Sequence, residues 1–255
     1  MTNDITTILY LLSGVLFILA IRGLSSPDTA RTGNYLGITG MAVAFIVTIV
    51  NLEQNSLINW LLIIFGISIG GIIGTYLSKR VAMTDMPQMV AALNSMGGMS
   101  AVLVAWAAFL SPGAFGLLIN GFINTSSIIQ MLLGILVGAI TFSGSVIAFL
   151  KLQGLMTGAP IILPFRHIIN ILIFVTILVL SSYMVINSND SHSFLFLLVT
   201  TLSLFLGLLL IIPIGGADMP VVISMLNFYS GWAAAGIGFT LENTALIITG
   251  ALVGS

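Results

Sequence analysis

Two asparagines stand inside long apolar stretches of this sequence, where a side-chain amide without a hydrogen-bond partner costs about 2 kcal/mol or more. They are Asn94 and Asn227, and each lies in one copy of a repeated segment, residues 83–101 (MTDMPQMVAALNSMGGMSA) and 216–234 (GADMPVVISMLNFYSGWAA). The two copies align without gaps. Either asparagine alone is explained by a hydrogen bond between packed helices. Two asparagines at matching depth favour a shared polar cluster that water can reach.

Each copy of the repeat contains Asp-Met-Pro, with Asp85 in the first copy and Asp218 in the second. This order is typical of a helix start, because the carboxylate can accept hydrogen bonds from the free amides and proline is tolerated in the first turn. Helix capping is therefore one interpretation of both aspartates. In the second copy Gly215 and Gly216 precede the motif. Paired glycines let the backbone change conformation at little steric cost, so a movable loop with a titratable group is the other interpretation.

Small residues surround both asparagines at helical spacing, which predicts close approach of neighbouring helices. The small residues are Ala91, Gly98 and Ala101 near Asn94, and Ser224, Gly231 and Ala234 near Asn227. A further stripe of small and hydroxyl-bearing residues consists of Gly134, Gly138, Thr141 and Ser145. Hydroxyls in membrane helices commonly bond to carbonyls of their own helix, so a single one says little. A ridge of Gly66, Gly70 and Gly74 also predicts helix packing.

The composition indicates that lipid covers most of the protein surface. Of 255 residues, 58% are hydrophobic and 5% are charged, against roughly 25% charged residues in soluble domains. Six basic and seven acidic residues do not make the basic surface that nucleic acid requires. Zero cysteines exclude disulfides and thiolate metal sites, and no phosphate-binding or zinc-binding motif is present. We expect this segment to bind no metal, no cofactor and no nucleic acid.

Nine continuous apolar runs approach the length of about 20 residues that a helix needs to cross a bilayer. They predict an all-α integral membrane bundle, since the strands of a barrel would alternate apolar and polar residues. The expected spans are residues 5–24, 35–52, 57–78, 86–110, 127–150, 167–187, 193–212, 219–239 and 244–255. The ninth reaches only about 18 Å. We therefore expect that the chain is a fragment or that a continuation exists elsewhere.

The distribution of charge predicts the orientation of the helices. With the N-terminus outside, every basic residue falls on the cytoplasmic side, namely Arg22, Arg31, Lys79, Arg80, Lys151 and Arg166. The outer side holds Asp4, Glu53, Asp190 and Glu242. Nine spans then place the C-terminal end in the cytoplasm. Both copies of the repeat enter the membrane from the same side, so the repeat is parallel rather than inverted.

No predicted span carries an ionisable residue near its middle. His167 lies beside Arg166 at the start of a span, and His192 lies in an outer polar loop. A proton pump normally has a titratable group near the midplane. This chain alone therefore lacks an obvious proton carrier.

Several segments closely resemble the membrane domain (domain II) of the proton-translocating NAD(P)+ transhydrogenase beta subunit. They are VAMTDMPQMVAALNSMGG, VGAITFSGSVIAFLKLQG, PIGGADMPVVISMLNFYSGWAAAGIGF and ITGALVGS, and the likeness runs along essentially all 255 residues. The resemblance implies that residues 1–255 are a single transmembrane proton-conducting domain, with the NADP(H)-binding domain of the family absent after residue 255. It also implies that the chain is the membrane portion of an enzyme and has no hydride-transfer site of its own.

The resemblance further implies a proton path through Asn94, Ser145 and Asn227. Some members of the family carry a histidine at the position of Asn94, whereas asparagine cannot titrate. We therefore expect the titratable histidine on a helix of a separate alpha subunit, with the amides and the hydroxyl holding a chain of water beside it.

At the cytoplasmic face the resemblance implies coupling to the NADP(H)-binding domain through Asp218, Gly215, Gly216 and Asp85. The complete enzyme would bind NAD(H) and NADP(H) in soluble domains, and the protonmotive force would drive hydride transfer between them. The expected partners are the lipid membrane, the NADP(H)-binding domain, and an alpha subunit that adds transmembrane helices and an NAD(H) domain. We expect a homodimer of the alpha-beta unit in a bacterial inner membrane.

Two other functions are open from the residues alone. A secondary transporter of a small solute is the first, because repeated helices with amides at the midplane also build such sites. No proline interrupts the centre of a span, however, and transporter repeats often enclose broken helices. The second is a scaffold subunit in which the amides only pack.

Overall fold

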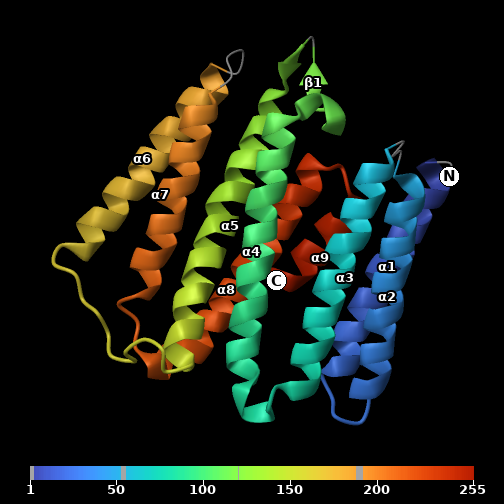
Figure 1. Ribbon diagram of the computed structural model, residues 1–255, viewed down its shortest axis with the longest axis horizontal. Helices are drawn as coiled ribbons and strands as arrows, with labels where there is room; N and C mark the ends of the chain where they lie inside the picture. Colours follow the sequence, from blue (N-terminus) through green and yellow to red (C-terminus); the bar gives the residue numbers. More distant parts are fainter. Residues whose placement is uncertain (1–2, 53–55, 120, 188–191) are drawn as a thin grey trace. The chain divides into compact units, whose positions relative to one another are not determined.

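The computed structural model describes residues 3–52, 56–119, 121–187 and 192–255, and nine α-helices lie in these ranges (Figure 1). The helices are α1 (Asn3–Leu24), α2 (Ala30–Asn51), α3 (Leu57–Arg80), α4 (Met86–Leu110), α5 (Thr125–Leu152), α6 (Arg166–Ile186), α7 (Ser193–Ile211), α8 (Met219–Thr240) and α9 (Thr244–Val253). The shorter elements are the 3-10 turns η1 (Met83–Asp85), η2 (Pro112–Phe115) and η3 (Gly216–Asp218), and a hairpin of β1 (Leu118–Ile119) and β2 (Phe122–Ile123).

The nine helices coincide with the nine predicted spans, which confirms an all-α membrane bundle. Helices α1 to α8 are long and apolar enough to cross a membrane. Helix α9 has ten residues, or about 15 Å, and is too short to cross alone. Helix α2 begins at Ala30 rather than at residue 35, because the polar turn before its apolar part is also helical. Glu53 and Asp190, which the charge pattern predicts on the outer side, lie outside the described residues.

The described residues up to Met86 form one compact unit, in which α1 and α2 pack through small residues. A Cβ atom built on Gly33 would lie 2.8 Å from the carbonyl oxygen of Ala20. The buried hydroxyl of Ser13 donates a hydrogen bond of 2.7 Å to the carbonyl oxygen of Gly40. Close contact of the two helices therefore depends on residues with little or no side chain.

Helix α3 carries the predicted glycine ridge and has no buried residue among its described positions. Space is open around a Cβ atom built on Gly66, Gly70 or Gly74. Helix packing through this ridge therefore stays a prediction.

Residues Pro87–Ser255 form the second unit, and α5 lies at its centre. In the most apolar 18 residues of α5, 61% are buried, the highest share among the eight long helices. Helix α5 packs against α6, α7 and α8, while α8 also packs against α9 (Figure 1). A helix surrounded in this way is positioned to respond to movement of its neighbours.

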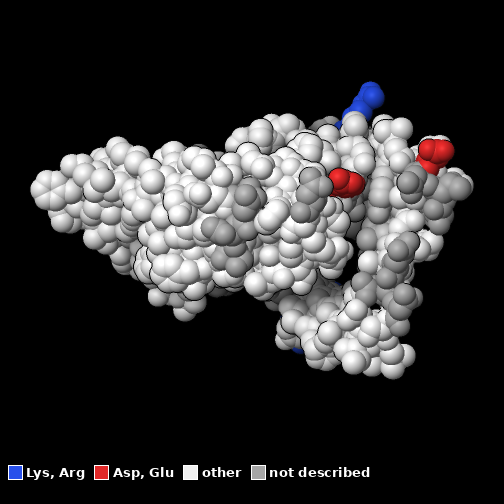
Figure 2. Space-filling view, turned by 90° about the horizontal axis from the view of Figure 1, so that it is seen from above, with Lys and Arg blue, Asp and Glu red and all other residues white. Residues whose placement is uncertain are grey.

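Charged side chains are sparse on the face drawn in Figure 2, where most of the surface belongs to other residue types. Large apolar side chains are exposed instead, such as Ile72 on α3 at 70% and Leu172 on α6 at 61%. Lipid hydrocarbon can cover apolar surface of this extent. A helix is stable there because its backbone groups form hydrogen bonds with one another. The protein is therefore a multi-pass membrane protein.

The internal repeat is visible in the backbone as well as in the sequence. In each copy a three-residue 3-10 turn, η1 or η3, leads directly into a long helix, α4 or α8. Asn94 and Asn227 are each the ninth residue of these helices. Helices α4 and α8 both run antiparallel to α5 and hence parallel to one another (Figure 1). This agrees with the parallel repeat expected for 83–101 and 216–234.

Candidate functional site

Helices α4 and α5 approach one another closely through Gly98 and Gly138. A Cβ atom built on Gly98 would lie 2.6 Å from the Gly138 carbonyl oxygen and 2.6 Å from the Phe142 amide nitrogen. Asn94 lies one turn before Gly98. Because the two helices are antiparallel, Asn94 lies at the level of the α5 turn that contains Ser145.

Gly144 marks the place where α5 meets both α7 and α8. A Cβ atom built on Gly144 would lie 2.9 Å from Cγ1 of Ile211 and 3.1 Å from Cδ2 of Leu226. Leu226 directly precedes Asn227, and Gly144 directly precedes Ser145. Both asparagines and the serine therefore lie at one depth of the second unit, which we call the polar level.

Two residues of the polar level contain buried polar atoms without a hydrogen-bond partner among the described residues. The atoms are Nδ2 of Asn94 and Oγ of Ser145, and the two residues are 7% and 0% exposed. Asn227 is half-buried. Buried amides and hydroxyls nearly always have a partner, and leaving one unpaired costs about 1–3 kcal/mol. The polar level therefore needs a polar partner.

Two other buried hydroxyls of α5, on Thr141 and Ser143, bond to their own helix, as expected. Oγ1 of Thr141 donates to the carbonyl oxygen of Val137 at 2.7 Å, and Oγ of Ser143 donates to that of Ala139 at 2.8 Å. Ser145 lies two residues further along and makes no such bond within the described chain. Its hydroxyl is therefore available to a partner that α5 does not supply.

Two apolar clusters lie on opposite sides of the polar level. The inner cluster lies toward loops 153–165 and 212–218, and its buried residues are Ala91, Ile147, Ala148, Ile211, Met219, Val222, Ile223 and Leu226. The outer cluster lies on the other side and includes Ala101, Ile135 and Ile237. On α4, α5 and α8 alike, the inner-cluster residues stand between the polar level and the loops. Apolar side chains therefore separate the polar level from the loop side.

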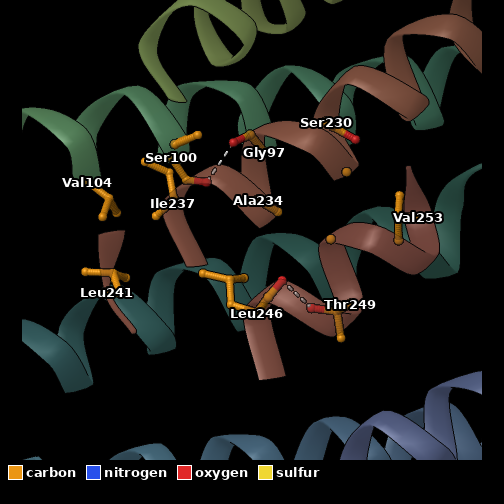
Figure 3. A pocket seen from close by; sticks show the side chains of 13 residues that line it. Gly97, Ser100, Val104, Ser230, Ala234, Ile237, Leu241, Leu246, Thr249 and Val253 are labelled. Atoms are coloured by element: carbon orange, nitrogen blue, oxygen red, sulfur yellow. Dashed lines mark hydrogen bonds between the residues drawn. The ribbon is translucent and has the colours of Figure 1, made fainter. Parts of the chain in front are cut away.

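A pocket of about 330 Å³ opens beside the polar level, on the side away from the inner cluster (Figure 3). Residues of α4, α8 and α9 line it, and Gly97 and Ser230 hold equivalent positions in the two repeats, each three residues after its asparagine. Figure 3 shows the Ser100 hydroxyl donating to the Gly97 carbonyl at 2.8 Å, and the Thr249 hydroxyl donating to the Leu246 carbonyl at 3.2 Å. The volume accommodates several water molecules.

The loop before α8 holds Gly215, Gly216 and Asp218. The Gly216 amide donates a 2.8 Å hydrogen bond to the Gly158 carbonyl oxygen. A Cβ atom built on Gly215 would lie 3.6 Å from Cγ of Pro160. Asp218 is exposed and occupies the N-cap position of α8, but its side chain makes no capping hydrogen bond. Its carboxylate is thus favoured by the helix dipole and is free to meet another partner.

The remaining titratable candidates lie at helix ends. Asp85 is exposed in η1 of the first unit. At the start of α6, Nε of Arg166 donates to Nε2 of His167 at 3.2 Å, and Nε2 of His192 lies 3.1 Å from the Asn187 carbonyl oxygen. Neither histidine is at the polar level. Within the ranges that the structure describes, no group of three His, Cys, Asp or Glu residues could hold a metal ion.

Comparison with known proteins identifies the family of this chain. A family model described as NAD(P) transhydrogenase beta subunit matches residues 6–255. The chain belongs to the NAD(P) transhydrogenase beta subunit family. Two curated relatives from Rhodospirillum rubrum, the second from a named strain, are both called "NAD(P) transhydrogenase subunit beta" and are each 54% identical over 255 residues. The match covers 100% of this chain and 54% of each relative, so the chain spans about half their length.

This beta-subunit family member also has a buried cation, Lys151, whose buried role the charge pattern alone does not predict. Lys151 is 5% exposed, and its ammonium group donates to the carbonyl oxygens of Ile212 and Ile214 at 2.6 and 2.7 Å. A lysine near the end of a span is explained by the positive-inside rule. The sequence signal for a buried role was its helical spacing from Gly144 and Ala148, which places all three on one face of α5.

The described residues of this beta-subunit family member do not include a strand-turn-helix framework for a nicotinamide dinucleotide. Such a nucleotide binds where a β-strand leads through a glycine-rich turn into a helix. The strands that the structure describes, β1 and β2, have two residues each and pair in a hairpin. The described part of the chain therefore supplies no framework of this kind for hydride transfer.

Proposed function

We propose that this chain is the proton-conducting membrane part of a transhydrogenase, a single transmembrane domain over residues 1–255. Its proton path runs along Asn94, Ser145 and Asn227. The observation that carries the proposal is that Nδ2 of Asn94 and Oγ of Ser145 are buried at one depth without partners among the described residues. Water from the adjoining pocket supplies those partners, and a chain of water and uncharged polar groups passes protons.

The pocket and the inner cluster together support a path that opens to one side at a time. The pocket adjoins the polar level on one side, and the inner cluster separates that level from the loops on the other. A continuous water channel would dissipate the proton gradient. An apolar barrier that opens only during turnover prevents this leak, as in alternating access.

The path also requires a group that titrates. Among the described residues of the second unit, the Asp, Glu, His, Lys and Arg side chains stand near helix ends, and Asn94 cannot ionise. A histidine on a transmembrane helix of the alpha subunit fills this role. It lies beside the water chain and exchanges protons with it.

In the complete enzyme, soluble domains bind NAD(H) and NADP(H), and this chain contributes no hydride-transfer site. The loop with Gly215, Gly216 and Asp218 contacts the NADP(H)-binding domain, and Asp85 takes part in the same coupling. The exposure of both aspartates supports this contact. The membrane potential supplies about 2.3 kcal/mol for each proton that crosses 100 mV, and this energy drives hydride transfer. The alpha-beta unit forms a homodimer in a bacterial inner membrane.

The test is Asn227→Leu in the complete enzyme, reconstituted into vesicles that carry a proton gradient. Leucine has a similar size but cannot bond to water. Hydride transfer driven by the gradient should fall about tenfold or more, which corresponds to a barrier rise of about 1.4 kcal/mol. Hydride exchange between the soluble domains should persist.

The matched control is Asn187→Leu, because Asn187 caps the end of α6 and bonds to the Tyr183 carbonyl away from the polar level. It should keep the gradient-driven rate. Full coupling in Asn227→Leu would contradict the proposed path. Solute uptake by vesicles that contain this chain alone would instead favour the secondary transporter.

A further inference from the structure

Lys151 is a buried cation that the proposed proton path does not use. It stands in the last turn of α5 and reaches across to the chain that follows α7. Its ammonium group donates to the carbonyl oxygens of Ile212 and Ile214 at 2.6 and 2.7 Å. Both distances are typical of strong, charge-assisted hydrogen bonds.

The partners of this ammonium group among the described residues are main-chain carbonyls, and neither is a carboxylate. They lie at the C-terminal end of α7, where Ile212 is the C-cap residue. The last carbonyls of a helix lack intrahelical donors and carry partial negative charge, which favours a cation. Removing these acceptors would leave a buried charge uncompensated, which is strongly unfavourable. The position of the segment after α7 and the position of α5 are therefore linked.

The same face of α5 connects Lys151 to the polar level. Gly144 lies seven residues earlier, or two helical turns, so both residues face in nearly the same direction. Gly144 lies against Ile211 of α7 and Leu226 of α8. Ile211 directly precedes one acceptor of the lysine, and both isoleucine and leucine belong to the inner cluster. A shift at the end of α7 therefore alters the apolar packing next to Ser145.

The segment that Lys151 holds is also tied to the loop after α5. The Gly216 amide donates to the Gly158 carbonyl at 2.8 Å, and the Ile161 amide donates to the Ile212 carbonyl at 3.4 Å. Ile212 thus accepts from both the lysine and loop 153–165. Residues 212–218 have two attachments, one to the buried end of α5 and one to the neighbouring loop.

We propose that Lys151 is a positioning residue that keeps the inner cluster closed. Its bonds to Ile212 and Ile214 hold the end of α7 against α5, and movement of segment 212–218 breaks them and loosens the apolar barrier below Ser145. This inference rests on the proposed function, because the barrier matters only if the polar level conducts protons.

The first test replaces Lys151 in the complete enzyme and compares gradient-driven hydride transfer with hydride exchange that needs no gradient. Lys151→Met keeps the length of the side chain and removes the charge and the donors. The stimulation by the gradient should fall about tenfold, within the range of typical coupling effects, while the exchange stays unchanged. Lys151→Arg keeps a charged donor and should restore most of the stimulation, which a merely space-filling role would not explain.

The matched control is Lys79→Met, because Lys79 is an exposed lysine near the end of α3. It should retain the stimulation of the unmodified enzyme. If Lys151→Met does not assemble, Gly144→Ala tests the same link without removing a charge. The added methyl presses on Cγ1 of Ile211 and Cδ2 of Leu226 and should also lower the stimulation.

The second test measures the position of segment 212–218 directly. Residues 1–255 contain no cysteine, so Ala217→Cys introduces a single reporter within them, next to Asp218. A water-soluble thiol reagent should label it several-fold faster in the Lys151→Met background. Thr84→Cys, the equivalent exposed position of the first repeat, should label at the same rate in both backgrounds.

Each result has a distinct meaning. Full stimulation in Lys151→Met and in Gly144→Ala, or unchanged labelling at position 217, would overturn the role of Lys151. If Asn227→Leu still abolishes coupling in that case, the proposed function stands and only this inference fails. If Asn227→Leu keeps full coupling, the proposed function itself fails.

Discussion

The backbones of Gly98 in α4 and Gly138 in α5 lie so close that a Cβ atom built on either would overlap the carbonyl oxygen of the other, at 2.6 and 2.9 Å. This contact lies one turn from Asn94 and sets the separation of the two helices at the polar level. Gly97 differs from its neighbour, because no atom outside its own helix turn lies within 4 Å of a Cβ atom built on it. Two adjacent glycines therefore have opposite environments.

Gly98→Ala should destabilise the protein, because its methyl group meets backbone atoms that cannot move aside. The free energy of unfolding should fall by about 1–3 kcal/mol, the usual cost of overpacking. Gly97→Ala should be neutral or raise stability by up to about 1 kcal/mol, since alanine favours the helix over glycine. Thermal unfolding in detergent compares the two variants. Equal melting temperatures would contradict the close approach of α4 and α5.

Ser145→Ala should separate function from stability. The variant removes a buried hydroxyl that has no partner among the described residues, so the free energy of unfolding should stay the same or rise by up to about 1 kcal/mol. Gradient-driven hydride transfer in the complete enzyme should nevertheless fall about tenfold, because the water chain loses a contact. Both quantities are measured on the same preparation.

Ser143→Ala is the control for this prediction, two residues away on the same helix. Its hydroxyl already donates to the Ala139 carbonyl at 2.8 Å. Losing that bond should lower the free energy of unfolding by about 0.5–1.5 kcal/mol and leave the gradient-driven rate intact. A larger loss of coupled rate in Ser143→Ala than in Ser145→Ala would assign the path to a different face of α5.

The sequence was sufficient to predict the helices and the repeat, for identifiable physical reasons. A long apolar run bounded by charged or turn residues predicts a helix, because a helix satisfies the hydrogen bonds of its own backbone in lipid. The equivalence of Asn94 and Asn227 followed from a motif that includes the helix start. Depth along a helix is fixed once that start is known, because every residue adds the same rise. The hairpin of β1 and β2 was not predicted, since two-residue strands leave no periodic pattern.

The packing of helix faces could not be predicted from one sequence. Gly66 and Gly98 both lie in small-residue stripes, yet a Cβ atom is free at the first and blocked at the second. The difference depends on which helix lies opposite, which spacing alone does not specify. The buried role of Lys151 was missed for a related reason. The positive-inside pattern already accounts for a lysine at this end of the helix. Only the fold shows that Lys151 is buried and bonded to the end of α7.

The pocket beside the polar level should contain water, and cysteine reactivity tests this. Ser230→Cys places a thiol on the pocket wall, and Leu226→Cys places one a single turn earlier on α8 in the inner cluster. Leu226 is 0% exposed. Thiols react as thiolates, which form in water and not in an apolar interior. A small water-soluble reagent should therefore label position 230 about tenfold faster or more than position 226. Equal protection of both positions would indicate a dry pocket and would remove the water source that the proposed path requires.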